Sequence, residues 1–137
     1  MYLTDTFTME PIIREATRKT PFVILDAASG IIEIKGRSIP ENSLAFYEQI
    51  ASWLEQYGSS PSAHTIVNFQ LEYFNTSSSK CILDLLKRLE LISKMGNSVE
   101  INWFYEELGD DIFEAGEDYQ TMININALKF NLIEIEQ

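Results

Sequence analysis

Hydrophobic and polar residues alternate along residues 65–73, in the middle of the chain. The apolar positions of this segment fall on one face of an extended chain; they are Val67, Phe69, Leu71 and Tyr73. The positions between them are polar. Alternation with a period of two is typical of a strand with one packed face and one wet face. We therefore predict a strand here, in a sheet that is covered mainly on one side.

The period changes from strand-like to helix-like after Asn75. Charged residues there lie opposite an apolar stripe at helical spacing, which consists of Cys81, Ile82, Leu85, Leu86, Leu89 and Ile92. Gly96 follows this pattern, as glycine often does at a helix end. The connection from strand 65–73 through helix 77–95 to strand 98–105 is long enough for a right-handed parallel crossover.

Two further segments precede the central strand. Residues 22–27 and 31–35 are β-rich runs on either side of a short loop, which predicts a hairpin. Apolar spacing over residues 47–57 then predicts a helix. Pro40 suits an early position of this helix, because its missing N–H would be unpaired there. Two residues are candidate caps for its start, namely Ser38 and Asn42.

Weaker patterns complete the predicted fold. Residues 12–13 and 131–135 are predicted edge strands, and a short helix is predicted around residues 112–113. Together these elements predict an α/β fold with a mixed sheet and helices packed mainly on one face, in a single domain over residues 1–137. Residues 1–10 are expected to form a poorly ordered or edge segment. Sheet and helices should bury most apolar residues and leave no spare apolar volume for a large cofactor.

Composition and charge exclude several classes of function. The chain has 137 residues and a formal net charge of −11 at pH 7. Nucleic acid and anionic membrane surfaces are therefore not expected partners, since phosphate binding needs clustered Lys and Arg. Nothing approaches the ~18 apolar residues of a membrane span, so membrane insertion is not expected. One cysteine cannot form an internal disulfide and no signal peptide is visible, so the expected location is the cytoplasm.

Candidate enzyme chemistry is sparse. The chain has one histidine, His64, and one cysteine, with no cluster at metal-ligand spacing, so no metal or cofactor is expected. The acidic segment 106–118 fits a solvated face best. The sharper interpretation is a docking surface for a basic partner, centred on Asp110 and Asp111. The spacing of the acidic residues does not match that of a calcium-binding loop. The alternative function is a small carboxylate-dependent enzyme that uses this segment together with Glu41.

The junction between strand 65–73 and the long helix has the clearest mechanistic content. Five consecutive side chains there can bind free backbone N–H groups, namely Asn75, Thr76, Ser77, Ser78 and Ser79. A hydroxyl at this place either caps the helix or accepts a phosphate. The helix dipole favours an anion there, and Lys80 lies one turn beyond Thr76. The fold should therefore tolerate a phosphate that a partner packed against the site would not tolerate.

Several stretches in order along the chain resemble the SiaC-type family of bacterial regulatory phosphoproteins, over roughly residues 10–135. The stretches that carry the resemblance are Ile34–Ser43, Leu71–Lys80, Ile101–Glu107 and Glu114–Asp118. The family is similar to the STAS domains of anti-sigma factor antagonists, which implies a STAS-like domain here. It also implies a non-enzymatic partner-switching protein, in which the phosphorylated threonine falls on Thr76.

The resemblance further implies the partners of such a protein. A serine/threonine kinase of the histidine-kinase-like ATPase type would add the phosphate, and a PP2C-type phosphatase would remove it. The unphosphorylated form would bind and stimulate a diguanylate cyclase, which raises cyclic di-GMP and favours biofilm. Besides the two aspartates of the acidic segment, candidate partner-binding residues lie at the junction of strand 65–73 with the long helix and in the turn before the helix at residues 47–57. They are Asn75, Ser77, Ser78, Lys80, Arg37, Glu41 and Asn42.

Overall fold

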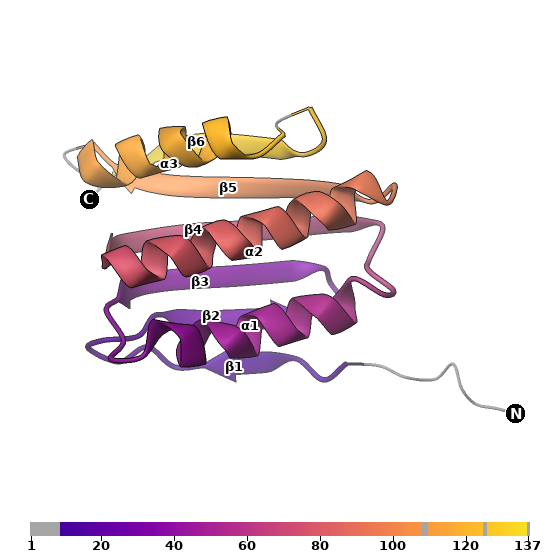
Figure 1. The fold of residues 1–137 in the computed structure, drawn as a ribbon, viewed down its shortest axis with the longest axis horizontal. Coiled ribbons are helices and arrows are strands. Elements are labelled where there is room, and N and C mark those ends of the chain that lie inside the picture. Colours follow the sequence, from indigo (N-terminus) through magenta and orange to yellow (C-terminus); the bar gives the residue numbers. More distant parts are fainter. Residues whose placement is uncertain (1–8, 108–109, 125, 137) are drawn as a thin grey trace, which may run out of the picture.

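Six strands form one sheet in which neighbours in space follow the order of the chain (Figure 1). The structure is a computed structural model that describes residues 9–107, 110–124 and 126–136. Of the five pairs of neighbouring strands, the first two are antiparallel and the other three are parallel. They are β1 (Ile12–Arg14), β2 (Phe22–Asp26), β3 (Ile31–Ser38), β4 (His64–Phe74), β5 (Ser98–Glu106) and β6 (Lys129–Ile135). The predicted hairpin and both predicted edge strands are thereby confirmed.

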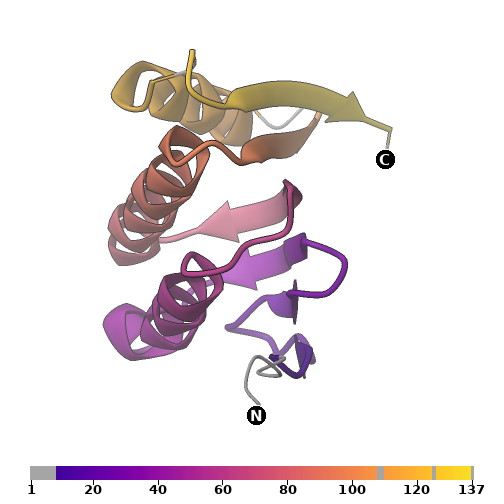
Figure 2. The same ribbon diagram turned by 90° about the vertical axis from the view of Figure 1, so that its right-hand side faces the viewer.

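One helix lies in each connection between parallel strands. These helices are α1 (Ser43–Tyr57), α2 (Thr76–Lys94) and α3 (Asp110–Met122). All three pack on the same face of the sheet, and the opposite face carries no helix in the described part of the chain (Figure 2). The mixed sheet with helices on one face confirms the predicted fold class. Each helix begins at the same end of the sheet, next to the carboxyl end of the strand before it (Figure 1).

The core lies between the sheet and this helical layer. All six residues of the predicted α2 stripe are buried, as are Val67, Phe69 and Leu71 of β4. Trp103 of β5 is 1% exposed and contacts several aromatic rings of the core. Burial of these large side chains supplies most of the stabilisation, at about 1.5–3 kcal/mol for each fully buried apolar side chain.

A bulge near the end of β4 corrects one part of the predicted pattern. Gly36 of β3 pairs with Leu71, but the next residue of β3 pairs with Tyr73, so Glu72 is an extra residue in β4. The bulge reverses the alternation, and Tyr73 is therefore 51% exposed instead of lying on the packed face as predicted. Phe74 turns towards the core in its place, where its ring meets Trp103 edge-on.

Helix boundaries differ from the prediction at two places. α1 begins at Ser43 with Asn42 as its cap, so Pro40 precedes the helix and is not one of its early residues. Ser38, the other candidate cap, is instead the last residue of β3 and is fully buried. α3 has 13 residues and is longer than the short helix predicted around residues 112–113.

Two expectations concern the chain termini and membranes. The segment predicted to be poorly ordered, residues 1–10, lies outside the described residues except for Met9 and Glu10. No helix within the described ranges is both long enough and apolar enough to cross a bilayer.

Candidate functional site: a helix start beside an apolar groove

The start of α2 is the centre of the candidate site. Asn75 has an extended backbone, and its side-chain oxygen accepts a hydrogen bond from the backbone N–H of Ser78, at 2.9 Å. This is the geometry of a helix cap. Thr76 is the first residue of the helix and its side chain is exposed. The helix therefore begins one residue earlier than predicted and presents Thr76 at its positively polarised end.

A cluster of hydroxyl groups lies beneath this helix start and joins three elements. The Ser38 hydroxyl at the end of β3 is 2.6 Å from the Tyr47 hydroxyl of α1 and 2.9 Å from the Ser78 hydroxyl of α2. The Ser43 and Ser77 hydroxyls, which belong to the first turns of α1 and α2, are 2.7 Å apart. These bonds fix the starts of the two helices relative to each other and to the sheet.

The predicted site residues at the start of α2 differ in how far they are buried. Ser78 is 0% exposed and its hydroxyl donates to the Ser38 carbonyl at 3.1 Å, so its side chain is not available to a partner in this structure. This corrects its inclusion among the partner-binding candidates. Thr76, Ser77 and Lys80 are exposed, and Asn75 is half-buried in its capping role.

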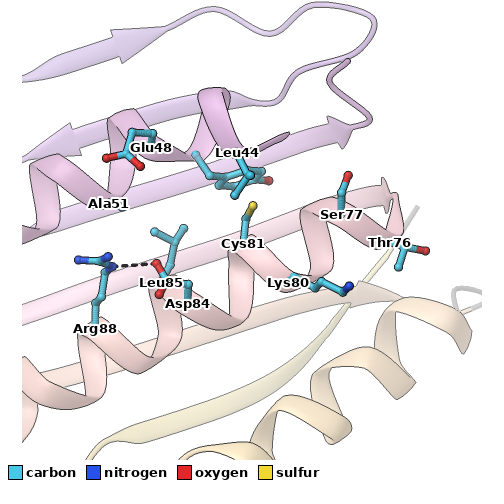
Figure 3. A pocket seen from close by; sticks show the side chains of 11 residues that line it. Leu44, Glu48, Ala51, Thr76, Ser77, Lys80, Cys81, Asp84, Leu85 and Arg88 are labelled. Carbon is cyan, nitrogen blue, oxygen red and sulfur yellow. Dashed lines mark hydrogen bonds and ion pairs between the residues drawn. The ribbon is translucent and has the colours of Figure 1, made fainter. Parts of the chain in front are cut away.

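An apolar groove of about 680 Å³ runs between α1 and α2, and Thr76 lies at one end of it (Figure 3). Its apolar lining comes from both helices and consists of Leu44, Tyr47, Ala51, Cys81 and Leu85. Leu44 is 77% exposed and extends the apolar lining of the groove to the protein surface. The sequence led us to expect no spare apolar volume for a large cofactor, and it did not reveal this open groove between the two helices.

Charged side chains rim the groove at both ends. Lys80 extends along α2 towards Thr76 at the end where the helix begins (Figure 3). Arg88 lies farther along the same helix and forms an ion pair with Asp84, at 2.8 Å between Nε and Oδ2. Glu48 of α1 faces this end as well. The groove thus has an apolar floor, a cation near Thr76 and mixed charges beyond it.

Two ionisable groups of the groove floor are held in their neutral forms. Burial raises the pKa of the Tyr47 phenol from 10.0 to about 12, although its hydrogen bond to Ser38 acts in the opposite direction. Burial also raises the pKa of the Cys81 thiol, with a smaller contribution from Asp84. A protonated, buried thiol is a poor nucleophile, which agrees with the predicted role of Cys81 as a core residue.

The remaining predicted residues lie at the same end of the molecule but apart from the groove lining. Arg37 is exposed, with its guanidinium carbon 6.0 Å from the centre of the Tyr73 ring. Glu41 is exposed and pairs with Lys19 at 3.7 Å. Asn42 accepts a hydrogen bond from the Ala45 N–H as the cap of α1.

Four acidic residues of the segment 106–118 have exposed side chains on α3, namely Asp111, Glu114, Glu117 and Asp118. Asp110 is the first residue of this helix, and Asp111 is exposed in its first turn. Within the ranges that the structure describes, no three His, Cys, Asp or Glu side chains are grouped so that they could hold a metal ion. His64 is exposed at the start of β4, where its Nδ1 is 2.8 Å from the Ser98 hydroxyl. Glu41 belongs to no group of three or more His, Cys, Asp or Glu side chains in the described part of the chain that could hold a metal ion.

The groove and the hydroxyl cluster are the parts that sequence reasoning missed. Both depend on how far apart α1 and α2 lie, which no period along one helix reveals. A weak signal existed in Leu44, an apolar residue one turn before Tyr47 at the start of the predicted helix. Ser43 gave no signal, because its hydrogen-bond partner Ser77 is 34 residues away in the chain.

Comparison with known proteins assigns this architecture to the class of regulatory phosphoproteins. The family model for SiaC family regulatory phosphoproteins matches residues 14–135, and the chain belongs to this family. The resemblance found in the sequence is thereby confirmed.

Individual relatives agree with this assignment. An uncharacterised protein of Pseudomonas aeruginosa (strain UCBPP-PA14) is 30% identical over 104 residues, which cover 76% of this chain and 82% of that protein. SiaC of Pseudomonas aeruginosa superimposes with a TM-score of 0.83 at 26% identity, over 93% of this chain and all of SiaC (100%). A crystal structure of the diguanylate cyclase SiaD with its activator SiaC, from the same species, gives a TM-score of 0.83 at 26% identity; the match covers 90% of this chain and 99% of that one.

Proposed function

We propose that this protein is a non-enzymatic, single-domain phosphoswitch in which phosphorylation of Thr76 controls the binding of a target protein in the groove between α1 and α2. The observation that carries the proposal is the position of Thr76, which is exposed at the first residue of α2 and also lines the groove. The same side chain is thus accessible to a kinase and adjacent to an apolar surface suited to a partner.

Phosphorylation would change the groove without unfolding the protein. A phosphothreonine carries about −1.5 to −2 charges and three strong acceptor oxygens. The helix start favours this charge, and Lys80 on the next turn can pair with it. A partner whose apolar side chains pack against the groove would have to desolvate the dianion, which is costly. The modified protein therefore stays folded and loses its partner.

The target that we propose is a diguanylate cyclase, stimulated by the unphosphorylated form. The supporting observation is the likeness to SiaC, which activates the diguanylate cyclase SiaD in Pseudomonas aeruginosa. Stimulation of such an enzyme raises cyclic di-GMP and would favour biofilm. A kinase of the histidine-kinase-like ATPase type and a PP2C-type phosphatase complete the proposed cycle, as the family resemblance implies. We place this cycle in the cytoplasm, which suits a chain whose one cysteine is buried and unpaired.

Substitution of Thr76 tests the proposal. Thr76→Glu should weaken binding to the cyclase by up to several hundredfold, the equivalent of about 3–4 kcal/mol, although one charge imitates phosphate imperfectly. Thr76→Ala should bind and stimulate the cyclase irrespective of the kinase. Affinity is measured by titration of labelled protein with the cyclase, and folding by circular dichroism.

The matched control is Ser60→Glu, which adds the same charge in the exposed loop after α1, at the opposite end of the helical layer. It should bind like the wild type. The intact mass of protein isolated from its native host should also show a shift of about 80 Da that a PP2C phosphatase removes. Equal affinity of Thr76→Glu and wild type for the cyclase would exclude the proposed mechanism.

A further inference from the structure

Two neighbouring hydroxyl groups at the start of α2 are exposed enough to accept a phosphate from a kinase. Of the four hydroxyl side chains at the start of α2, Ser78 is fully buried and Ser79 is half-buried. Thr76 and Ser77 are both exposed, and both line the groove. Exposure alone therefore does not explain why one of them, and not the other, should receive the phosphate.

Hydrogen bonding distinguishes these two residues. The Ser77 hydroxyl is 2.7 Å from the Ser43 hydroxyl and donates to the Asn75 side-chain oxygen at 3.3 Å. The Thr76 hydroxyl has no hydrogen-bond partner among the residues that the structure describes. Thr76 is thus free to turn towards an approaching nucleotide, whereas Ser77 is engaged with two other side chains.

Ser43 is itself fixed in position. It is 5% exposed as the first residue of α1, and its hydroxyl is also 3.5 Å from that of Ser78, which in turn bonds to Ser38. The Ser43 hydroxyl therefore cannot follow Ser77 outwards without a shift of the α1 start. The 2.7 Å between the two hydroxyls leaves no room for a phosphate on Ser77 in its observed position, so the Ser77 side chain would first have to rotate away from Ser43.

We propose that Ser43 is a specificity-determining residue that holds the Ser77 hydroxyl away from the kinase and so directs the phosphate to Thr76. In the transfer, the acceptor oxygen forms a bond to the γ-phosphorus of the kinase's ATP while the bond to the bridging oxygen breaks. ADP leaves, and the hydroxyl proton passes to a base on the kinase. Ser77 must first lose its bond to Ser43 to enter this geometry, and Thr76 need not.

The test uses full-length protein isolated from its native host, and it rests on the proposed phosphorylation of Thr76. Occupancy of each site is measured by fragmentation mass spectrometry. Ser43→Ala should raise the ratio of Ser77 to Thr76 phosphate about fivefold, which corresponds to about 1 kcal/mol for one lost hydrogen bond. In a Thr76→Ala background, the same change should raise Ser77 occupancy by a similar factor.

Two controls separate positioning from general destabilisation. Ser52→Ala removes another α1 hydroxyl, which bonds to Glu48, and should leave the ratio unchanged. Ser43→Cys keeps a side-chain donor but makes it larger and its hydrogen bond weaker, and it replaces Ser43→Ala if that variant does not fold. A merely structural role of Ser43 would lower the melting temperature without moving the site ratio.

The outcomes distinguish this inference from the proposed function. An unchanged ratio in folded Ser43 variants that still carry phosphate on Thr76 would overturn the role of Ser43 and leave the phosphoswitch intact. Absence of phosphate from Thr76 in the wild type under all growth conditions tested would overturn both proposals.

Discussion

Single hydroxyl groups organise the site at the residue scale. Ser38 is 0% exposed and its hydroxyl contacts those of Tyr47 and Ser78, one from each helix that borders the groove. A buried hydroxyl is tolerated only when it is hydrogen-bonded, because an unpaired one costs about 1–3 kcal/mol. Each member of the cluster therefore depends on the others, and together they hold the floor of the groove beneath Thr76.

Tyr47 gives this cluster a measurable pH dependence. Burial raises its pKa from 10.0 to about 12 in the folded protein. The folded-state pKa of Tyr47 lies above its unfolded value, so the fold favours the neutral phenol. The free energy of unfolding is therefore unaffected by this group below about pH 10, and it falls as the pH rises towards about 12. The loss should be on the order of 2–3 kcal/mol.

Urea unfolding across this pH range provides the measurement. Tyr47→Phe should lose less stability than the wild type between about pH 10 and pH 12, because no phenol remains to ionise there. Tyr73→Phe removes an exposed phenol instead and should follow the wild-type curve. Parallel curves for Tyr47→Phe and wild type would show that Tyr47 is not held neutral by the fold.

At the scale of secondary-structure elements, the sequence predicts correctly the features that depend on a single helix or strand. It does not predict the features that depend on contacts between two elements. The α2 stripe was predicted correctly because a period of 3.6 residues belongs to the helix itself. Tyr73 was misplaced because the bulge at Glu72 comes from pairing with β3, where Gly36 has a φ of +119°. Of the two candidate caps of α1, Asn42 was predicted correctly, whereas Pro40 was misplaced because it lies before this cap and not in the helix.

The length of α3 illustrates the same limit. Gly116 lowers intrinsic helix propensity in the middle of this segment, so the sequence favours a shorter helix than the 13 residues observed. Packing explains the glycine: a Cβ at this position would lie 2.6 Å from both Leu132 and Trp103. The absence of a side chain is what lets α3 approach β5 and β6.

Gly116→Ala should therefore destabilise the protein even though alanine is the better helix former. Overpacking of this kind costs typically about 1–3 kcal/mol, which exceeds the ~1 kcal/mol gained in propensity. Trp103 should report the change directly, since its indole N–H donates to the Ile112 carbonyl at 2.8 Å. Urea unfolding followed by tryptophan fluorescence measures both the loss of stability and the change around Trp103.

The control for this substitution is Glu117→Ala, at the exposed neighbouring position, which should be near neutral. A stabilised Gly116→Ala variant would contradict the packing argument.

At the scale of the whole molecule, charge and helix direction act together. The net charge of −11 repels acidic surfaces and attracts basic ones over several ångströms. All three helices begin at one end of the sheet, where Thr76 also lies (Figure 1). A phosphate at that end would be favoured locally by the α2 dipole and would add to the negative charge of the whole chain. In the proposed mechanism, long-range attraction would bring a basic partner to the protein, and contact at the groove would decide how long it stays bound.

If long-range attraction and contact at the groove act separately, a change of charge on α3 should alter the association rate and a change at Thr76 should alter the dissociation rate. Asp111→Lys reverses one exposed charge in the first turn of α3. If the acidic segment that includes Asp110 and Asp111 guides a basic partner, the variant should associate with the cyclase a few-fold more slowly and with a flatter salt dependence, while its dissociation rate stays close to that of the wild type. Thr76→Glu should show the opposite pattern, with its main effect on dissociation.

Stopped-flow or surface-binding kinetics at about 50 and about 300 mM salt would resolve these two effects. The matched control is Glu55→Lys, which makes the same change at an exposed position near the other end of α1. Both substitutions alter the net charge equally, so a general charge effect would slow both variants alike. A slower association confined to Asp111→Lys would assign the steering to the α3 face, and equal association rates for the two lysine variants would remove that face from the docking mechanism.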